Sequence, residues 1–330
     1  MESHELPLVS IVIPVKDEGR FIERCLESIV AQDYPRDRIE VIVVDDSSSD
    51  GTRELAGNYA VFSFAAFRLI ASTRVGTAAA RNIGLDNATG TVIIPLIGHA
   101  ELAPEYASLA VATLEDRDVD CVGGLVETRG RGVVGRAIAL ALSSRFGVGN
   151  AAFRVGGEGL VDTVAFGAYR REVFDTLGGF LEGEDAGEDD EFNYRLIEDG
   201  RAIYLNPSLR ATYHARRSLS ALAHQYRAYG RAKVAVLAAH PRLVQPRQLA
   251  PVALVGGLGA FSLAGVLLRR WRPLRLLLRA YSGFLAVATL AAVRRSPASA
   301  ALMPGVVATV HISYGVGFLQ GLASRMVGGR

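Results

Sequence analysis

The distribution of charge along the chain is the feature that most constrains its fold. All 34 acidic residues lie in residues 1–199 together with 18 of the 36 basic ones, which gives this part a net charge of −16. Residues 200–330 carry the other 18 basic residues and no acid, a net charge of +18. Because half of the chain is also hydrophobic, with a mean hydropathy of +0.23, we expect an acidic globular part followed by a basic part associated with a membrane.

Length and composition exclude several classes of protein. The 330 residues suffice for more than one average domain. The 35 glycines have no triplet period, which excludes a collagen-like chain, and the high apolar content excludes a disordered one. The two cysteines, Cys25 and Cys121, stand among aliphatic residues, so we expect free buried thiols of a reducing compartment rather than a disulfide scaffold.

The N-terminal part alternates between strand and helix patterns. Residues 10–15 and 40–44 are short continuous runs rich in valine and isoleucine, typical of strands buried on both faces. Residues 19–32 between them carry a helical apolar stripe, so the chain opens with a βαβ unit and a parallel sheet. Further strands are expected at 67–71, 91–97, 120–128 and 202–205, and further helices after 50–52 and at 77–85, 102–114, 170–177 and 190–199.

The C-terminal part is expected to lie at or in a membrane. Residues 218–240 form a basic amphipathic helix, which favours the membrane interface, with a solvated basic face packed on the domain as the alternative. Three apolar stretches follow, at 251–268, 274–293 and 302–323. We therefore expect a globular domain over 1–217, an interfacial helix region over 218–250 and a membrane region over 251–330.

The number of membrane spans stays open between two and three. Three full spans from a cytosolic N-terminal domain would place the five arginines of residues 269–279 outside, against the positive-inside tendency. A re-entrant or interfacial first stretch would keep these arginines inside, and we favour this arrangement. The acidic N-terminus, which runs directly into a strand, predicts no secretory signal.

Acidic and hydroxyl residues gather where ligands bind in open α/β sheets. The run DDSSSDGT at 45–52 follows the second strand, and Asp17 follows the first, so both point toward one crevice at the strand ends. A carboxylate there can accept a hydrogen bond from a ribose hydroxyl or a base N–H. The alternative is an acidic loop in which Ser49 or Asp50 caps the next helix.

Several ordered motifs together decide between these alternatives, and with them the sequence closely resembles the family 2 glycosyltransferases of GT-A fold. The motifs are SIVIPVKDE at 10–18, EVIVVDDSSSDGT at 40–52, RVGTAAARNIGL at 74–85, EDDEFNYRL at 188–196 and QYRAYGRAK at 225–233. Residues 146–180 and HISYGVGFLQGL at 311–322 are similar to the succinoglycan-type exopolysaccharide branch. The resemblance implies a Rossmann-like mixed sheet flanked by helices, followed by an interfacial helix and membrane helices.

The resemblance also implies sugar transfer from a nucleotide-sugar donor with inversion at the anomeric carbon. The residues at the strand ends would hold the nucleotide, and Arg81 would approach the diphosphate. These nucleotide-binding residues are Pro14, Asp17, Asp45, Asp46 and Arg81.

An inverting transfer needs one carboxylate to take the proton of the acceptor hydroxyl. The acidic cluster at 188–191 can supply it, and the family pattern assigns the base to Asp189, with Asp190 as the substitute candidate. A charged helix cap is the alternative for this cluster. Acceptor or diphosphate contacts fall by the same resemblance on Glu188, Gln225, Tyr229 and Arg231.

The metal motif of the family is altered in this chain. Mg²⁺ or Mn²⁺ is usually held there by Asp-x-Asp or Asp-x-His, but Ile97 occupies the first acidic position. His99 remains and Glu101 is near, which leaves a weaker metal site, charge neutralisation by arginines, or loss of activity as the three consequences.

We therefore expect a membrane-anchored inverting glycosyltransferase that uses a nucleotide sugar, UDP-linked in the first instance. Its acceptor would be a lipid-linked saccharide of a bacterial surface polysaccharide, and its catalytic domain would face the cytoplasm at the inner membrane. The alternative is a degenerate family member that binds nucleotide or a partner as a membrane scaffold. Nucleic acid is excluded as a partner because the basic residues flank apolar stretches.

Overall fold

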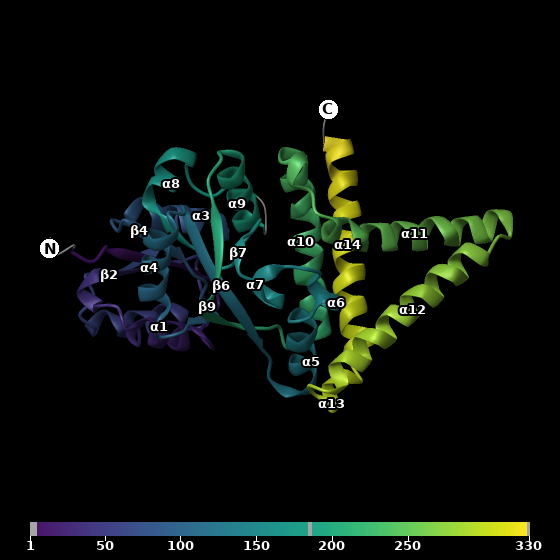
Figure 1. The fold of residues 1–330 in the computed structure, drawn as a ribbon, viewed down its shortest axis with the longest axis horizontal. Coiled ribbons are helices and arrows are strands. Elements are labelled where there is room, and N and C mark those ends of the chain that lie inside the picture. Colours follow the sequence, from purple (N-terminus) through teal and green to yellow (C-terminus); the bar gives the residue numbers. More distant parts are fainter. Residues whose placement is uncertain (1–4, 184–186, 329–330) are drawn as a thin grey trace. The chain divides into compact units, whose positions relative to one another are not determined.

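The computed structural model describes residues 5–183 and 187–328. The chain divides into two compact units, which are interleaved in the sequence. The first unit comprises residues up to 127 and residues 155–214, and the second comprises residues 128–154 and those from 215 onward. Figure 1 shows the fold of the chain, with its helices and strands labelled.

The first unit is built on one mixed sheet, which has nine strands within the described residues. β1, β2, β3 and β4 pair in parallel in the order β3-β2-β1-β4, and the sheet continues with β8, β6, β9 and β5, while β7 pairs with β9. The pairs formed by β4 with β8, β6 with β8, and β9 with both β5 and β7 are antiparallel. The strands are β1 (Val9–Val15), β2 (Ile39–Asp45), β3 (Ala66–Ala71), β4 (Val92–Pro95), β5 (Ala100–Leu102), β6 (Cys121–Arg129), β7 (Gly159–Leu160), β8 (Ala168–Arg170) and β9 (Ile203–His214).

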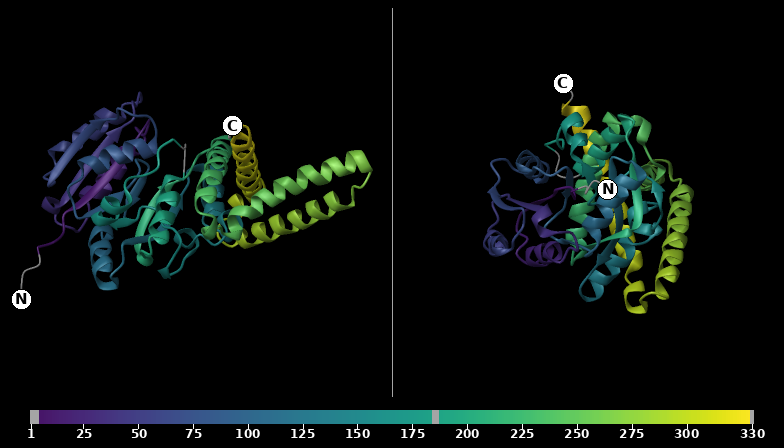
Figure 2. Two further views of the ribbon diagram at one scale, coloured as in Figure 1. Left: turned by 90° about the horizontal axis from the view of Figure 1, so that it is seen from above. Right: turned by 60° about the vertical axis from the view of Figure 1, so that its left-hand side comes forward.

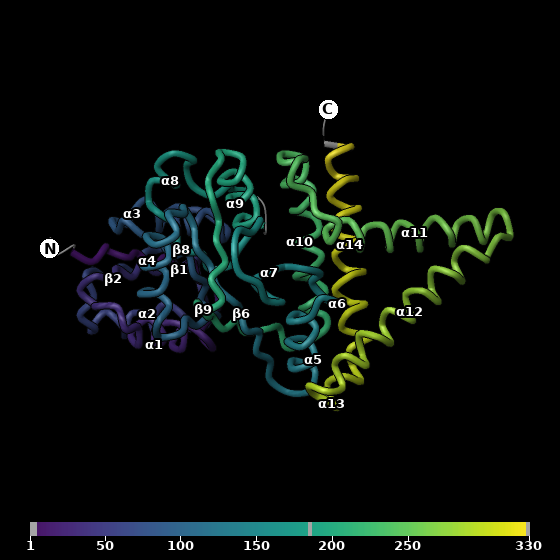
Figure 3. Tube along the Cα trace, viewed as in Figure 1, coloured from purple at the N-terminus to yellow at the C-terminus, as the bar shows by residue number. Residues whose placement is uncertain are grey.

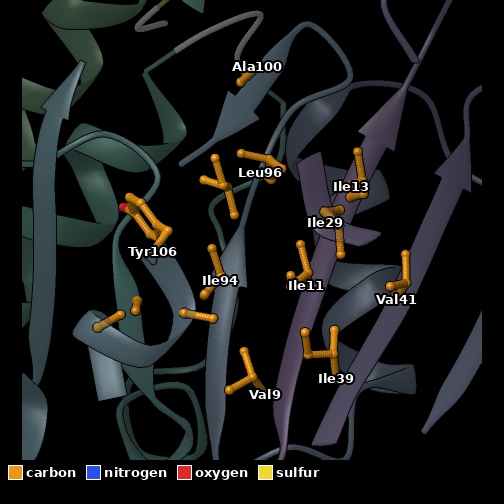
Figure 4. Packing of buried hydrophobic residues seen from close by; sticks show 14 of the residues in the cluster. Val9, Ile11, Ile13, Ile29, Ile39, Val41, Ile94, Leu96, Ala100 and Tyr106 are labelled. Atoms are coloured by element: carbon orange, nitrogen blue, oxygen red, sulfur yellow. The ribbon is translucent and has the colours of Figure 1, made fainter. Parts of the chain in front are cut away.

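Helices cover both faces of this sheet, and β1 and β2 are therefore buried along their whole length. Val9, Ile11 and Ile13 of β1 share one core cluster with α1 and α4, as Figure 4 shows for part of that cluster. Val12 points to the opposite face and packs against α3. The helices of this unit are α1 (Ile22–Val30), α2 (Thr52–Gly57), α3 (Thr77–Asn87), α4 (Tyr106–Arg117), α8 (Arg171–Leu177) and α9 (Glu188–Glu198), with short 3₁₀ turns at Arg36–Arg38 and Asn58–Val61.

The second unit is helical. α10 and α14 lie side by side, and α11 and α12 form a hairpin beside them (Figures 2 and 3). Its helices are α5 (Gly132–Leu142), α6 (Arg145–Val148), α7 (Ala152–Val155), α10 (Leu219–Ala239), α11 (Pro246–Leu268), α12 (Arg272–Val293), α13 (Pro297–Ala300) and α14 (Met303–Gly328), with a 3₁₀ turn at Pro241–Leu243.

Three helices of the described chain are long and apolar enough to cross a membrane: α11, α12 and α14. The hairpin helices bury little of their surface, and Val266, Leu267 and Leu268 near its tip are 65–68% exposed. Such exposed leucines and valines are costly in water. His311 in α14 has a polar partner inside the second unit, because its Nδ1 lies 3.2 Å from the Tyr281 hydroxyl.

The predicted fold class is confirmed, since the sheet opens with parallel strands, helices flank it and apolar helices follow. Cys25 and Cys121 are free and buried, as predicted. Some boundaries are wrong. The helix expected from residue 102 is preceded by the short strand β5 and begins at Tyr106, and the strand expected at 202–205 extends to His214.

Candidate active site

The carboxyl ends of β1 and β2 bring the predicted nucleotide residues to one edge of the sheet. Val15 pairs with Asp45 in the parallel register, so Asp17 and Asp46 follow directly at neighbouring strand ends. Ser49 donates to Asp17 Oδ1 from its backbone N–H (2.8 Å) and its hydroxyl (3.1 Å). Pro14 is buried inside β1, opposite Val44.

Asp45 and Asp46 are both largely buried at this edge, and each has a basic neighbour. Asp45 accepts from the Ser48 N–H (3.1 Å) and lies 3.7 Å from Nη1 of Arg53. Asp46 Oδ2 lies 3.3 Å from Nζ of Lys16 and accepts from the Gly76 N–H (3.1 Å). The edge therefore presents anchored carboxylates beside two half-exposed cations.

Asp17 and Ser47 hold the two loops of this edge in an unusual conformation. Their φ angles are +53° and +59°, in the left-handed region. Asp tolerates this region, whereas Ser adopts it rarely, and such residues often occur at functional sites. The structure thus joins Asp17, Asp45 and Asp46 in one loop pair, as the sequence predicts.

α3 runs from this edge to the acidic cluster. Its N-terminus is next to Gly76, the donor to Asp46. Gly84 lets it approach β1 closely, because a Cβ there would lie 2.2 Å from Cγ1 of Val12. Arg81 is 5% exposed, lies with its guanidinium 5.1 Å from the centre of the Phe180 ring, and places Nη1 3.0 Å from Oε1 of Glu188.

The next residue, Asn82, fixes the segment that leads to the cluster. Its side chain donates to the Phe180 carbonyl (2.8 Å) and accepts from the Phe180 N–H (2.7 Å). It also donates to Oε1 of Glu182 (2.8 Å), which Arg74 contacts at 2.5 Å. The Arg-Asn pair of the AAARN segment therefore ties α3 to the residues just before α9.

The acidic cluster forms the first turn of α9, after Gly187 with φ of +86°. The pKa of Asp189 is raised from 3.8 to about 6, chiefly because the carboxyl is removed from water, and further by the charges of Glu188 and Asp190. Arg81 and a hydrogen bond from the Asp190 N–H oppose the rise. Asp189 is thus a stronger base than an ordinary aspartate and is still mostly ionised at neutral pH.

Asp190, the substitute candidate for the base, belongs to a buried polar chain. The Thr163 hydroxyl donates to Asp190 Oδ1 (3.0 Å) and accepts from Nδ2 of Asn193 (2.9 Å). The Tyr169 hydroxyl in turn donates to Oδ1 of Asn193 (2.8 Å). Because this chain fixes the carboxylate of Asp190, the geometry favours Asp189 over Asp190 for proton transfer.

The residues at the end of β4 do not fit a divalent cation as they are arranged here. Ile97 is packed against the core. His99 Nδ1 lies 2.5 Å from Oε1 of Glu18, and Glu101 Oε1 lies 2.5 Å from Nε2 of His214. Within the described residues no group of three or more His, Cys, Asp or Glu could hold a metal ion. The metal-binding role of His99 and Glu101 stays a prediction.

Gln225, Tyr229 and Arg231, the predicted acceptor residues, lie on α10 in the second unit. Gln225 donates from Nε2 to the Tyr229 hydroxyl (3.0 Å), one turn along the helix. Their role with the acceptor stays a prediction.

Sequence reasoning missed four residues that position the site: Lys16, Asn82, Thr163 and Phe180. Lys16 and Asn82 stand inside the quoted motifs next to Asp17 and Arg81, so the motifs themselves carried a signal for them. Thr163 and Phe180 also lie inside a quoted run, residues 146–180, but their contacts with Asp190 and Arg81 join residues that are far apart in the sequence.

Comparisons with known proteins identify the family. A sequence-family model described as Glycosyl transferase family 2 matches residues 10–178. Glycosyltransferase AglE of Haloferax volcanii is 37% identical over 122 residues, 37% of this chain and 40% of that protein, so the chain matches only two fifths of its length. Succinoglycan biosynthesis protein ExoA of Rhizobium meliloti is 29% identical over 257 residues, 77% of this chain and 78% of that protein.

A third relative and two solved structures complete the comparison. The dolichyl N-acetyl-alpha-D-glucosaminyl phosphate 3-beta-D-2,3-diacetamido-2,3-dideoxy-beta-D-glucuronosyltransferase of Methanococcus voltae is 28% identical, over 68% of this chain and 72% of that protein. Mannosyltransferase PcManGT from Pyrobaculum calidifontis, in complex with GDP-Man and Mn²⁺, has a TM-score of 0.61 at 22% identity and covers 97% of this chain and 88% of its own. S. aureus TarS with UDP-GlcNAc has a TM-score of 0.52 at 18% identity, over 97% and 92%.

The two structures, at these identities, show the fold. The family model covers just over half of the chain, from the first strand to the end of α8. The protein therefore belongs to the family 2 glycosyltransferases and is a transferase with a GT-A-like fold.

Proposed function

We propose that this protein is a membrane-anchored, inverting glycosyltransferase. It transfers a sugar from a nucleotide-sugar donor, a UDP-sugar in the first instance, to a lipid-linked saccharide of a bacterial surface polysaccharide. The first unit faces the cytoplasm, and α11, α12 and α14 provide the anchor. The observation that carries the proposal is Asp189, a carboxylate with a pKa of about 6 in the same unit as the strand-end carboxylates.

The donor nucleotide is proposed to bind at the ends of β1 and β2. Asp17, Asp45 and Asp46 are anchored there by backbone and side-chain donors, which keeps their remaining oxygens in place for a ribose hydroxyl or a base N–H. PcManGT holds GDP-Man and TarS holds UDP-GlcNAc, so nucleotide-sugar donors occur among proteins of this fold.

In the proposed reaction Asp189 takes the proton from the acceptor hydroxyl as its oxygen attacks the anomeric carbon. The bond from that carbon to the diphosphate oxygen breaks, and its electron pair leaves with the nucleoside diphosphate. Attack on the face opposite to the leaving group inverts the configuration. A base with a pKa near 6 suits this task, because it is available at neutral pH and accepts a proton more readily than an ordinary aspartate.

The charge of the departing diphosphate needs cations, and the nucleotide edge carries them. Lys16 and Arg53 lie beside Asp46 and Asp45 with half of their side chains exposed. Arg74 lies close by in sequence, just before α3, with 44% of its side chain exposed. We propose that these three residues neutralise the diphosphate. Arg81 forms an ion pair with Glu188 and lowers the pKa of Asp189. A contact of Arg81 with the diphosphate stays a prediction.

The acceptor is proposed from the relatives and the apolar helices together. The printed names of two relatives refer to a dolichyl-linked sugar phosphate and to succinoglycan. Three helices able to cross a membrane would keep the enzyme where a lipid-linked acceptor is found. This combination supports a lipid-linked saccharide over a soluble sugar.

Calorimetric titration of nucleotide into the full chain in detergent tests the donor half of the proposal. UDP and GDP are titrated in EDTA and then with Mn²⁺, using wild type, Asp45→Asn and the control Asp86→Asn, an exposed residue of α3. We expect UDP binding that weakens at least about tenfold in Asp45→Asn and is unchanged in Asp86→Asn. If neither nucleotide binds the wild type under either condition, the proposal fails and the scaffold alternative takes its place.

A further inference from the structure

A pocket of about 540 Å³ lies between α10 and α14, inside the second unit. It is lined by His224, Arg227 and Arg231 of α10 and by Gln320, Ala323 and Ser324 of α14. Of these six residues two are permanently cationic, one is a histidine and none is acidic. This pocket is separate from the proposed nucleotide site, because the residues of the nucleotide site belong to the first unit.

The helical repeat explains why these side chains face one another. Positions 224, 227 and 231 are spaced three and four residues apart, so they lie along one face of α10. Positions 320 and 324 are spaced by four and lie along one face of α14. Successive turns of α14 contact successive turns of α10. Gly317 packs against the carbonyl of Arg227, and Gly321 packs against that of Arg231. One turn further on, the Arg325 side chain donates to the carbonyl of Val234 (3.3 Å).

Glycine makes this close approach possible. A Cβ at Gly317 would lie 2.0 Å from the Arg227 carbonyl oxygen, and one at Gly321 would lie 2.8 Å from that of Arg231. Gly317 and Gly321 form the small-xxx-small pattern that lets membrane helices pack tightly. The side chain of Gln320 between them accepts a hydrogen bond from Nε of Arg227 (2.7 Å), which orients the guanidinium at the wall of the pocket.

The lining of the pocket is cationic. Arg227 and Arg231 are like charges one turn apart, an arrangement that by itself destabilises a helix. No aspartate or glutamate occurs after residue 199, and the remaining segment of the second unit, residues 128–154, contains none either. A phosphate group, with oxygens that match the fork of a guanidinium, is the ligand for which such a pair is best suited.

The position of the pocket along α14 places that anion at a membrane surface. About 20 helical residues cross the hydrocarbon core of a bilayer. A span that begins with α14 at Met303 therefore ends near Leu322. Gln320, Ala323 and Ser324 then lie at the level of the lipid headgroups, where phosphate groups are concentrated.

We propose that the pocket between α10 and α14 binds a phosphate group carried by a lipid. The lipid is either the diphosphate-linked acceptor or an anionic phospholipid of the surrounding membrane. The first case rests on the proposed function and makes the pocket part of the acceptor site; the second is independent of it and makes the pocket a lipid-anchoring site.

Binding is measured by calorimetry on the full chain in a maltoside detergent, which itself contains no phosphate. The probes are farnesyl diphosphate, dioctanoyl phosphatidylglycerol and inorganic pyrophosphate. We expect at least one lipid probe to bind at least ten times more tightly than pyrophosphate. Preference for farnesyl diphosphate assigns the pocket to the acceptor, and preference for phosphatidylglycerol assigns it to the membrane lipid. Absence of lipid binding, or pyrophosphate binding of equal strength, would overturn the proposal.

The double variant Arg227→Gln/Arg231→Gln is expected to weaken binding of the lipid probe at least tenfold. The matched control Arg294→Gln/Arg295→Gln removes two exposed charges after α12 and should bind as the wild type does. Arg227→Lys/Arg231→Lys keeps the charge and should recover most of the affinity. Equal binding by the glutamine pair and the wild type would refute the assignment. UDP binding, measured on the same samples, reports on the proposed function separately.

Discussion

Replacing Asp189 by asparagine should make the protein more stable while it removes the proposed base. The folded structure raises the pKa of this carboxyl from 3.8 to about 6, so folding disfavours its charged form. At about 1.4 kcal/mol per pKa unit, a rise of roughly two units corresponds to about 3 kcal/mol of destabilisation at neutral pH. Asparagine has a similar shape and carries no charge, so it avoids this cost.

The pH dependence gives the prediction its sign. Below about pH 4 the carboxyl is protonated in both the folded and the unfolded chain, and the wild type bears no penalty. The penalty grows as the pH rises from 4 to 6 and is complete above 6. Asp189→Asn should therefore exceed the wild type in stability by up to about 3 kcal/mol at pH 7.5, and the difference should vanish near pH 4.

The buried thiols of Cys25 and Cys121 provide the assay, because both lie in the first unit. Their reaction with dithiodipyridine during heating of the detergent-solubilised chain reports the unfolding of that unit. At roughly 2–4 °C per kcal/mol, the midpoint at pH 7.5 should rise by about 6–12 °C. Asp86→Asn, an exposed control, should leave it unchanged. An unchanged or lower midpoint for Asp189→Asn, or a difference that persists at pH 4, would refute the reasoning.

Three further predictions concern other parts of the molecule. Arg81→Gln removes the cation that opposes the pKa rise of Asp189, so the acid limb of the pH–rate profile should move to higher pH, whereas Arg81→Lys should move it less; identical profiles would contradict this. Ile97→Asp should strengthen UDP binding in Mn²⁺ relative to EDTA at least about tenfold by restoring an oxygen ligand, and an unchanged ratio would show that no metal site can form there. Gly317→Leu should separate α14 from the Arg227 carbonyl and lower thermal stability by about 2 kcal/mol or more. The control in the same detergent is Gly256→Leu, because a Cβ at Gly256 meets no atom within 4 Å.

The parts of the fold that could be predicted are those whose cause is local in the sequence. The runs at 10–15 and 40–44 are continuous and apolar because β1 and β2 are buried on both faces. β5 has only three residues, too few for any periodicity to be detected. β9 extends through Asn206, Pro207 and Ser208, residue types that are common in turns. The strand residues on either side of this run pair with β7 and β5, which the local sequence does not reveal.

In the candidate site, too, some contacts follow from the local sequence and others form only when distant segments fold together. Asp17, Asp45 and Asp46 follow predicted strands, and parallel strands end at one edge, so their proximity follows from the pattern. The pairing of Arg81 with Glu188 joins residues more than a hundred positions apart, and only the folded chain brings them together. His99 with Glu18 and Glu101 with His214 are also brought together only by folding. From the sequence alone, His99 and Glu101 therefore looked available as metal ligands.

Transfer of labelled sugar into lipid tests the central claim most directly. Membranes that contain the full chain are incubated with tritiated UDP-sugars, and label is counted in the lipid extract for wild type and Asp189→Asn across pH 5–8. We predict transfer by the wild type that falls as the pH drops below about 6, and a rate at least about a hundredfold lower in the variant although it is the more stable protein. Near-wild-type transfer by Asp189→Asn would contradict the assignment of this residue as the base.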